Sequence, residues 1–243
     1  MPTVKINIQV NYFQTIIIFL KLGILICLFS CGEIASDTQT TNSTQSTSRS
    51  ESRDSIDYLA AFYDSLTIIT RESWGATPPI SEMKTHELKR ITIHHSAVKH
   101  RLDYDPAEKI KGLQRFSQSE SQLASGKMKE AWADIPYHFI IYANGEIVEG
   151  RSLEYVGDTN TEYDPSGHLL INLDGNFEEQ VPTEPQIKSL INLCFYFSQK
   201  YKIDIALTEG HKDFAQTLCP GKNLYEQIPS IKDAILTMNI KSD

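Results

Sequence analysis

Two kinds of hydrophobic spacing alternate along residues 56–243 of the chain. Apolar residues recur three or four positions apart, as on one face of a helix, in the segments 56–66, 105–116, 183–197 and 229–238. Short apolar, β-branched runs that are typical of buried strands lie between these segments, at 90–95, 168–173 and 203–210. Because helices and strands interleave, we predict an α/β fold with a mixed central β-sheet flanked by helices, in a single domain.

Capping signals indicate where two of these helices begin. Asp105 is expected to cap the first, with Pro106 in its first turn and Glu108 completing a capping box. The sequence "TEPQ" at 183–186 is a second capping box, ahead of a helix with an apolar stripe.

A hairpin is expected at 137–150, "YHFIIYANGEIVEG", between two of the predicted helices. Its Asn144-Gly145 pair is the one that favours a two-residue type I′ turn. The polar residues 117–130 ahead of it are expected to form a loop.

The N-terminal segment has a pattern that separates it from the folded domain. An apolar run at 22–29 follows Lys5 and Lys21, and it is too short to span a bilayer but fits a signal peptide. The run ends at Cys31 after a small residue, which resembles the lipobox of bacterial lipoproteins. We therefore expect a lipoprotein-type signal peptide over 1–30 and a lipid anchor on the Cys31 thiol. The alternative is an ordinary N-terminal anchor helix with a chance cysteine.

Residues 31–55 are rich in Ser and Thr and almost free of apolar side chains. Such a segment cannot bury enough surface to repay its ordering, so we expect a flexible linker that spans roughly 25–30 Å. The expected protein is thus lipid-anchored in the cell envelope, with residues 56–243 as its folded domain.

The charge balance narrows the class of partner. The formal net charge is −8, and the only charged residues before Cys31 are lysines. Nucleic-acid-binding proteins usually present basic patches, so the sequence argues against a nucleic-acid partner. The net negative charge is otherwise explained by solubility alone.

Three segments carry candidate chemistry: "ITIHHSA" at 91–97, "WADIPYHF" at 132–139 and "GHKDFAQTLCPG" at 210–221. Each lies at the end of a predicted strand or just after one. Neutral imidazoles and one thiolate make a good ligand set for Zn²⁺, and a catalytic zinc site keeps one coordination position open. Cys219 could instead form a disulfide with Cys194, although Cys194 lies on an apolar helical stripe that favours the core.

Strand periodicity leaves part of the ligand choice open. Successive strand residues point to opposite faces, so His94 and His95 cannot both face one metal unless the strand breaks between them. The same argument applies to Tyr137 and His138. Spacing alone does not decide which member of each pair faces the site.

Taken together and in this order, the three segments resemble the type 2 N-acetylmuramoyl-L-alanine amidase family, which includes the peptidoglycan recognition proteins. The similarity extends from "TRESWGA" at 70–76 to about Met238 and includes "GNFE" at 175–178. The order of the motifs, with H-x₇-C-P-G last, is specific, whereas any one of them alone would be weak.

The resemblance implies an amidase or peptidoglycan-recognition-type fold with Zn²⁺ bound by His94, His211 and Cys219. It also implies that Tyr137 and Thr217 are catalytic side chains beside the metal. The implied activity is zinc-dependent hydrolysis of the amide between N-acetylmuramic acid and L-alanine, with peptidoglycan or muropeptides as the partner. Members that only bind the wall often replace the ligand cysteine with serine, so the cysteine here favours an enzyme.

Further side chains near the motifs are candidates for other roles. Trp132, His95 and His138 could contact the substrate, and for each the alternative is a packed structural position. Asp213 could orient a metal-bound imidazole, or it could cap the turn that follows it.

The sequence departs from the family's pattern beside the expected substrate groove. Pro136 replaces a usual glycine, and Thr159 stands where a histidine would fall. "HLLI" at 168–171 replaces a usual "SIGI"; His168 could substitute for the missing histidine, but a surface position is favoured. These departures keep two alternatives open: a non-catalytic peptidoglycan-binding or inhibitor protein, and a zinc hydrolase of another amide.

Overall fold

The computed structural model describes residues 56–123 and 126–238. The predicted signal peptide over 1–30, the lipidation site Cys31 and the predicted linker over 31–55 lie outside the described residues. Among the described helices, none combines the length and the apolar character needed to cross a membrane.

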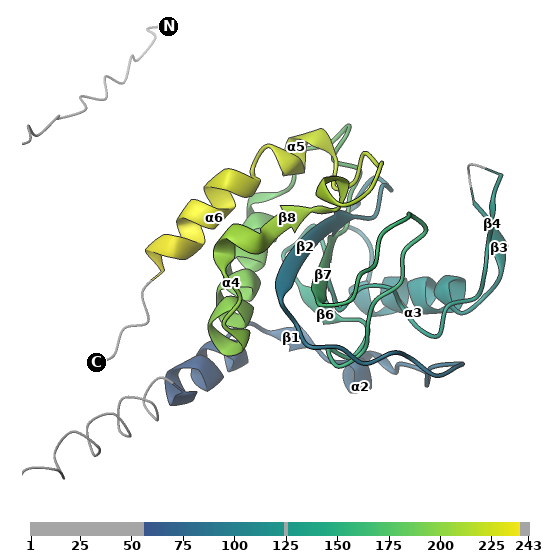
Figure 1. Cartoon of the computed structure of the whole chain (residues 1–243), viewed down its shortest axis with the longest axis horizontal. Coiled ribbons are helices and arrows are strands. Elements are labelled where there is room, and N and C mark those ends of the chain that lie inside the picture. Colours follow the sequence, from purple (N-terminus) through teal and green to yellow (C-terminus); the bar gives the residue numbers. More distant parts are fainter. Residues whose placement is uncertain (1–55, 124–125, 239–243) are drawn as a thin grey trace, which may run out of the picture. The chain divides into compact units, whose positions relative to one another are not determined.

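A six-stranded mixed sheet forms the centre of the described fold (Figure 1). In spatial order its strands are β1 (Ile68–Ile69), β6 (Ile147–Glu149), β5 (Phe139–Ile141), β7 (His168–Leu173), β2 (Arg90–His95) and β8 (Thr208–Gly210). β5 and β6 run antiparallel, and every other neighbouring pair in this sheet is parallel. The predicted mixed central sheet is confirmed.

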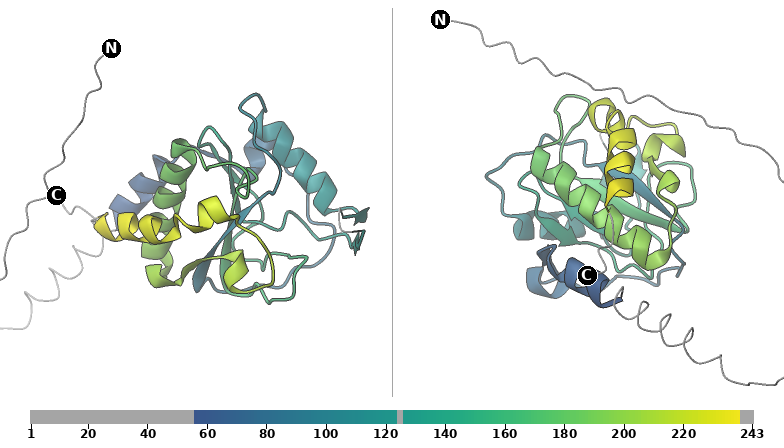
Figure 2. Two further views of the ribbon diagram at one scale, coloured as in Figure 1. Left: turned by 90° about the horizontal axis from the view of Figure 1, so that it is seen from above. Right: turned by 90° about the vertical axis from the view of Figure 1, so that its left-hand side faces the viewer.

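Helices cover both faces of this sheet (Figures 1 and 2). The elements α4 (Glu184–Tyr201) and α6 (Ile228–Thr237) pack on one face, and α2 (Arg71–Trp74) and α3 (Pro106–Ser117) pack on the other. The larger core lies under α4 and α6, and residues 56–64, which are helical, pack against it. Each large apolar side chain buried there contributes about 1.5–3 kcal/mol.

The predicted helix starts agree with the structure at α4 and in part at α3. Thr183 Oγ1 accepts from Gln186 N–H at 3.2 Å, and Gln186 Oε1 accepts from Thr183 N–H at 3.1 Å, which makes the expected capping box. Asp105 caps α3, but Glu108 does not reach back to it. Glu108 pairs with Lys111 at 2.9 Å, one turn further along the helix.

The hairpin joins β5 to β6 as predicted, but the prediction of a type I′ turn is wrong. That turn needs positive φ at both central residues, and only Gly145, at 87°, has it. Gly145 N–H donates to Tyr142 O at 2.8 Å, and Tyr142 N–H donates to Glu146 O at 2.9 Å, which makes a three-residue connection. Pro185 explains the glycine, because a Cβ at Gly145 would lie 2.8 Å from the proline Cβ.

Two further segments differ from their predictions. The expected loop at 117–130 contains the end of α3 and a short antiparallel pair, β3 (Ser121–Gln122) with β4 (Met128–Lys129). The expected strand at 203–210 is a 3₁₀ turn over Ile205–Leu207 followed by β8. Asp204 favours the turn, since its side chain accepts from Ala206 N–H at 2.9 Å.

Candidate metal centre

The parallel pairing of β2 with β8 brings His94 and His211 together. Ile93 pairs with Gly210, so the next residue of each chain segment, His94 and His211, lies at the same edge of the sheet. The centroids of the two imidazole rings are 4.5 Å apart. Strand alternation turns Ile93 into the larger core and leaves His94 on the opposite face.

Cys219 reaches the same point from the turn that follows β8. Its carbonyl accepts from Lys212 N–H at 2.8 Å, and its sulfur accepts from His95 N–H at 3.4 Å. The chain leaves this turn through Gly221, whose φ is 87° and where a Cβ would lie 2.5 Å from the carbonyl carbon of Phe177. Only glycine fits this approach, which accounts for the glycine in the Pro-Gly pair that follows the cysteine.

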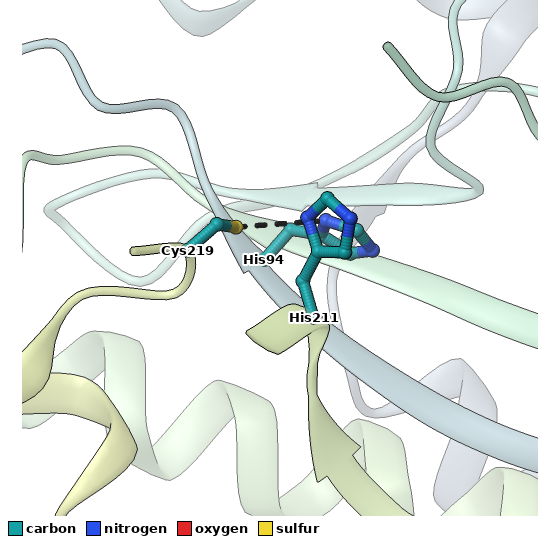
Figure 3. A group of neighbouring side chains, drawn as sticks. All are labelled: His94, His211 and Cys219. Carbon is teal, nitrogen blue, oxygen red and sulfur yellow. Dashed lines mark hydrogen bonds between the residues drawn. The ribbon is translucent and has the colours of Figure 1, made fainter. Parts of the chain in front are cut away.

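The three candidate donor atoms lie within 4.8 Å of one another, and Figure 3 shows the side chains converging. Cys219 Sγ is 3.6 Å from His94 Nδ1. Two ligands of a tetrahedral Zn²⁺, at about 2.3 Å for sulfur and about 2.0–2.1 Å for nitrogen, are themselves about 3.6 Å apart. The sulfur and the nitrogen therefore have the spacing of two ligands that share one ion.

Burial sets the charge state of this cluster. Burial, with the neighbouring histidines, holds the pKa of His94 well below its usual value, and burial lowers the pKa of His211 to about 4. Burial also raises the pKa of the Cys219 thiol to about 12, against the opposing effect of the His95 N–H. Neutral imidazoles can bind a metal directly, and a cation would hold the sulfur as a thiolate.

The disulfide alternative is wrong, because Cys194 and Cys219 are both free. Cys194 is fully buried on α4 within the larger core, where burial raises the pKa of its thiol. Its neighbours are apolar, as the helical stripe in the sequence indicated. Cys219 is thus the cysteine that is placed for metal chemistry.

The outer nitrogens of the two imidazoles have different surroundings. Nε2 of His211 lies 2.7 Å from Thr161 Oγ1, which leaves Nδ1 of that ring for a metal. Nε2 of His94 is buried and has no hydrogen-bond partner within the described part of the chain. Asn172, which pairs with His94 across β2 and β7, has a buried side-chain oxygen in the same condition.

Asp213 does not contact a metal-side imidazole. Its carboxylate accepts from Gly210 N–H at 2.8 Å and from the Tyr225 hydroxyl at 2.5 Å. Neither predicted role is seen: Asp213 is the last residue of the 3₁₀ turn His211–Asp213 and bonds back to Gly210 at its start, so it caps the turn that contains it and not the one that follows.

A cleft of about 470 Å³ lies over the three donors, and Tyr137, Trp132 and Thr217 line it with them. The Tyr137 ring is 5.2 Å from the His94 ring, and burial raises the pKa of the phenol, so its hydroxyl stays protonated. Thr217 Oγ1 accepts from Cys219 N–H at 3.2 Å, which leaves the hydroxyl proton of Thr217 for another partner.

His95 stands between the cleft and the core. It lines the cleft, and its Nδ1 accepts from Phe177 N–H at 3.2 Å. The neutral ring therefore carries its proton on Nε2. Burial lowers the pKa of His95 to about 4, and the nearby carboxylate of Glu178 opposes that shift.

Two other histidines serve the fold. Nδ1 of His138 accepts from Leu170 N–H, and its Nε2 donates to Tyr155 O, both at 2.9 Å, so the ring has no polar atom left for a substrate. The predicted substrate contact does not fit this position. His168, expected at the surface, is only 6% exposed; its Nδ1 lies 2.8 Å from Thr92 Oγ1, because pairing of β7 with β2 places it against that strand.

The sequence-based predictions did not include two residues that contact His211. Thr161 binds its Nε2, and the Tyr163 ring lies 5.0 Å from its ring. Both follow Thr159 closely, the position at which the sequence analysis noted a departure from the family's pattern. That departure was the available signal that the contacts here could differ.

The described residues form a mixed α/β fold whose cleft gathers two imidazoles and a thiol that could hold a metal ion. The family described as N-acetylmuramoyl-L-alanine amidase matches residues 84–222, and the chain belongs to this family. The matched residues include His94, His211 and Cys219.

The relatives of this chain include recognition proteins and amidases. Peptidoglycan-recognition protein SD of Drosophila simulans is 29% identical over 169 residues, which cover 66% of this chain and 83% of the relative. N-acetylmuramoyl-L-alanine amidase of Sus scrofa is 27% identical over 180 residues, 71% of this chain but 28% of the relative. Both recognition proteins and amidases therefore share this domain.

Solved structures of peptidoglycan recognition proteins have a fold similar to that of this chain. The structure of peptidoglycan recognition protein-LE in complex with tracheal cytotoxin, a monomeric diaminopimelic acid-type peptidoglycan, has a TM-score of 0.57 and 27% sequence identity. The match covers 68% of this chain and 93% of that chain. The crystal structure of Drosophila peptidoglycan recognition protein SD matches with the same TM-score of 0.57, at 29% identity, over 66% of this chain and 92% of that chain.

Proposed function

We propose that this chain is a zinc-dependent N-acetylmuramoyl-L-alanine amidase that acts on peptidoglycan or muropeptides. The observation that carries the proposal is the gathering of His94, His211 and Cys219 donor atoms within 4.8 Å at the cleft. Membership of a family described by that activity supports it, and so does the name of the Sus scrofa relative. The relative bound to tracheal cytotoxin supports a peptidoglycan fragment as the ligand class.

The donor set fits Zn²⁺ by its chemistry. Imidazole nitrogen and thiolate sulfur are the ligands that Zn²⁺ most often takes in proteins, and three of them leave a position open. Nδ1 of His94, Nδ1 of His211 and Sγ of Cys219 would hold the ion. When bound, Zn²⁺ supplies Lewis acidity that activates water and polarises an amide carbonyl.

Tyr137 and Thr217 supply hydrogen-bond donors to the reacting carbonyl. The phenol of Tyr137 stays protonated because burial raises its pKa, so it donates to the negative charge that develops on the carbonyl oxygen. Thr217 accepts from Cys219 N–H and keeps its own proton for the same purpose. Both side chains line the cleft with the three metal-side residues.

Trp132 and His95 bound the space in which the substrate lies. Both line the cleft, Trp132 with an apolar ring and His95 with a neutral imidazole whose proton is on Nε2. An aromatic wall suits the apolar face of a sugar or a peptide side chain, and an N–H donor suits a peptide carbonyl. These two residues are the proposed substrate contacts of the cleft.

The direct test is to incubate the full-length chain with purified muropeptides and to identify products by mass spectrometry. Release of free stem peptides that a chelator abolishes and added Zn²⁺ restores would support the amidase. Tight binding without release would replace it with a recognition or inhibitor protein. Cleavage at a different amide would replace it with another zinc hydrolase.

We also propose that the protein is lipid-anchored in the cell envelope, which rests on the lipobox-like sequence at Cys31. Metabolic labelling with an alkyne-bearing fatty acid should label the native protein and not Cys31→Ala. Mass spectrometry should find a mature N-terminus at Cys31. An intact N-terminus, or labelling that survives the substitution, would refute the anchor.

A further inference from the structure

Two threonine hydroxyls connect the wall of the cleft to His211. Thr161 Oγ1 lies 2.7 Å from His211 Nε2 and 2.8 Å from Thr159 Oγ1. Thr161 N–H also donates to Thr159 Oγ1 at 3.1 Å. We refer to Thr159 and Thr161 as the hydroxyl relay.

One proton arrangement in the relay suits metal binding. With Nε2 of His211 directed at Thr161, the nitrogen on the donor side is Nδ1, which binds a metal only through its lone pair. The ring proton then lies on Nε2 and is donated to Thr161 Oγ1. Thr161 in turn donates its hydroxyl proton to Thr159 Oγ1, which also accepts the Thr161 N–H. The reverse arrangement would put the ring proton on Nδ1, the nitrogen that faces the ligand atoms of His94 and Cys219. That proton would block metal coordination by His211.

The segment that carries the relay is held at both ends. Asp158, just ahead of it, pairs with Arg151, a buried side chain that also donates from Nε to Ile135 O at 2.8 Å. Just after it, the Tyr163 ring lies 5.5 Å from the ring of His168, the first residue of β7, and 5.0 Å from the His211 ring. The segment is thus packed against the sheet on both sides of Thr161, and the His211 ring is confined on one side.

Asp213, the other residue considered as an orienting partner of His211, is engaged elsewhere. Its carboxylate accepts from Gly210 N–H and from the Tyr225 hydroxyl. The relay is therefore the contact that sets which nitrogen of His211 faces the donor cluster. Thr159 and Thr161 lie outside the three motifs that carry the resemblance to the family.

We propose that Thr161, supported by Thr159, is a positioning residue: it fixes the tautomer and the orientation of His211 for metal binding. The inference rests on the proposed function, because it concerns a ligand of the same site. Outer partners of metal-binding histidines typically change metal affinity or activity by about 10- to 100-fold when they are removed. Loss of the Thr161 hydroxyl should have an effect of that size.

The first measurement is the Zn²⁺ affinity of the full-length chain, by competition with a chromophoric chelator. Thr161→Val should bind Zn²⁺ about 10- to 100-fold more weakly than the native chain. Thr161→Ser, which keeps the hydroxyl, should restore most of the affinity, and Thr159→Val should fall between them. Glu162→Gln, an exposed change in the same segment, should have no effect.

The second measurement is independent of metal and of turnover. Nitrogen-15 NMR of the metal-free chain should show His211 with its proton on Nε2 in the native protein and in Thr161→Ser. Thr161→Val should give a mixture of the two tautomers. If that variant does not fold, Thr161→Ala removes the same hydroxyl and takes its place in both measurements.

The outcomes separate the relay from the amidase. Native Zn²⁺ affinity in Thr161→Val, or an unchanged His211 tautomer, would overturn the positioning role even in an active enzyme. A chain that shows the Nε2–H tautomer and its loss in the variant, but that releases no stem peptide, would keep the relay and refute the amidase. A native chain that holds the proton on Nδ1 would refute the relay directly.

Discussion

The backbone N–H of His95 donates a hydrogen bond to the sulfur of Cys219 across 3.4 Å. Strand β2 therefore contributes twice to one site, since His94 also places Nδ1 3.6 Å from the same sulfur. An N–H that belongs to a central strand cannot turn away, so it stabilises negative charge on the sulfur without any rearrangement. Strand β2 thus helps to fix the place of the sulfur that the turn after β8 carries.

Replacing Cys219 with serine should remove tight metal binding. A serine hydroxyl is a poor Zn²⁺ ligand at neutral pH, so the loss should exceed the 10- to 100-fold cost of removing an outer partner. Inductively coupled plasma mass spectrometry, on protein equilibrated with Zn²⁺ and then desalted, would measure the metal content. Cys194→Ala is the control, because it removes a thiol that lies in the core away from the site and should keep the native metal content. Equal metal in Cys219→Ser and the native chain would show that the ligand set is wrong.

Replacing Tyr137 with phenylalanine should separate binding from turnover. Loss of one donor to a developing oxyanion typically lowers kcat by about 10²–10³, and the ring itself would still fill its place beside His94. We expect kcat to fall on that scale while the affinity for Zn²⁺ stays native. Tyr104→Phe, on an exposed side chain, is the control. A native kcat in Tyr137→Phe would exclude the hydroxyl from the reaction.

Thr217→Val should affect both the metal and the reaction, unlike the tyrosine change. Its hydroxyl accepts from Cys219 N–H, so the variant loosens the turn that holds the sulfur as well as losing a donor. Steady-state kinetics and Zn²⁺ competition on the same preparation would show whether kcat and metal affinity fall together. A fall in kcat alone would mean that Thr217 acts only as a donor to the substrate.

Local signals in the sequence were sufficient for the elements that depend on near neighbours. The capping box at Thr183 and Gln186 needs residues three positions apart, and the run at 90–95 has the composition of a buried strand. The predicted hairpin turn was wrong because Tyr142 N–H donates to Glu146 O, which places residues 143–145 in the connection instead of two residues. The Asn-Gly pair alone does not show where the flanking strands stop pairing.

For the site, too, the sequence predicted the residues but not the contacts that bring them together. The motifs and the family resemblance named His94, His211 and Cys219. The two histidines meet because Ile93 pairs with Gly210 in the sheet, and Cys219 joins them from the turn after β8. That register is a long-range property that spacing does not carry. His168 was misplaced for the same reason, since its burial comes from pairing with β2 and not from its polar flanks.

Lys129 should be more important to stability than a surface lysine. It is 2% exposed, and its Nζ donates to the carbonyls of Ser117, Ser119 and Glu130 and lies 4.5 Å from the Trp132 ring centroid. Lys129→Met would leave these acceptors without their charged donor, and we expect a loss of about 2–4 kcal/mol in the free energy of unfolding.

Urea unfolding followed by tryptophan fluorescence would test this prediction, because Trp132 borders the lysine. Lys111→Met is the control: that side chain is 36% exposed and pairs with Glu108 on the surface of α3. An exposed pair of this kind contributes about 0–1 kcal/mol. Equal losses in the two variants would mean that the buried contacts of Lys129 do not stabilise the fold.

Acid should weaken the fold because burial keeps several histidines neutral. Burial lowers the pKa of His138 to about 3, and its Nδ1 accepts a hydrogen bond that protonation would remove. In the unfolded chain the same imidazole takes up a proton near pH 6.5. Between about pH 6.5 and 3 the unfolded state therefore binds more protons, and the free energy of unfolding falls as the pH falls.

For each such histidine, the free energy of unfolding should fall by about 1.4 kcal/mol per pH unit. His95 and His168, whose pKa values are lowered to about 4, add to this effect in the same direction. Urea unfolding of the metal-free chain at several pH values from 7 to 4 would measure the slope. His138→Gln lowers stability at pH 7 because glutamine cannot reproduce both ring contacts, so the informative quantity is the slope and not the absolute value. In this variant the free energy of unfolding should change less steeply with pH than in the native chain, by up to about 1.4 kcal/mol per pH unit, which corresponds to one proton. Parallel pH profiles for the two proteins would mean that His138 is not held neutral in the folded state.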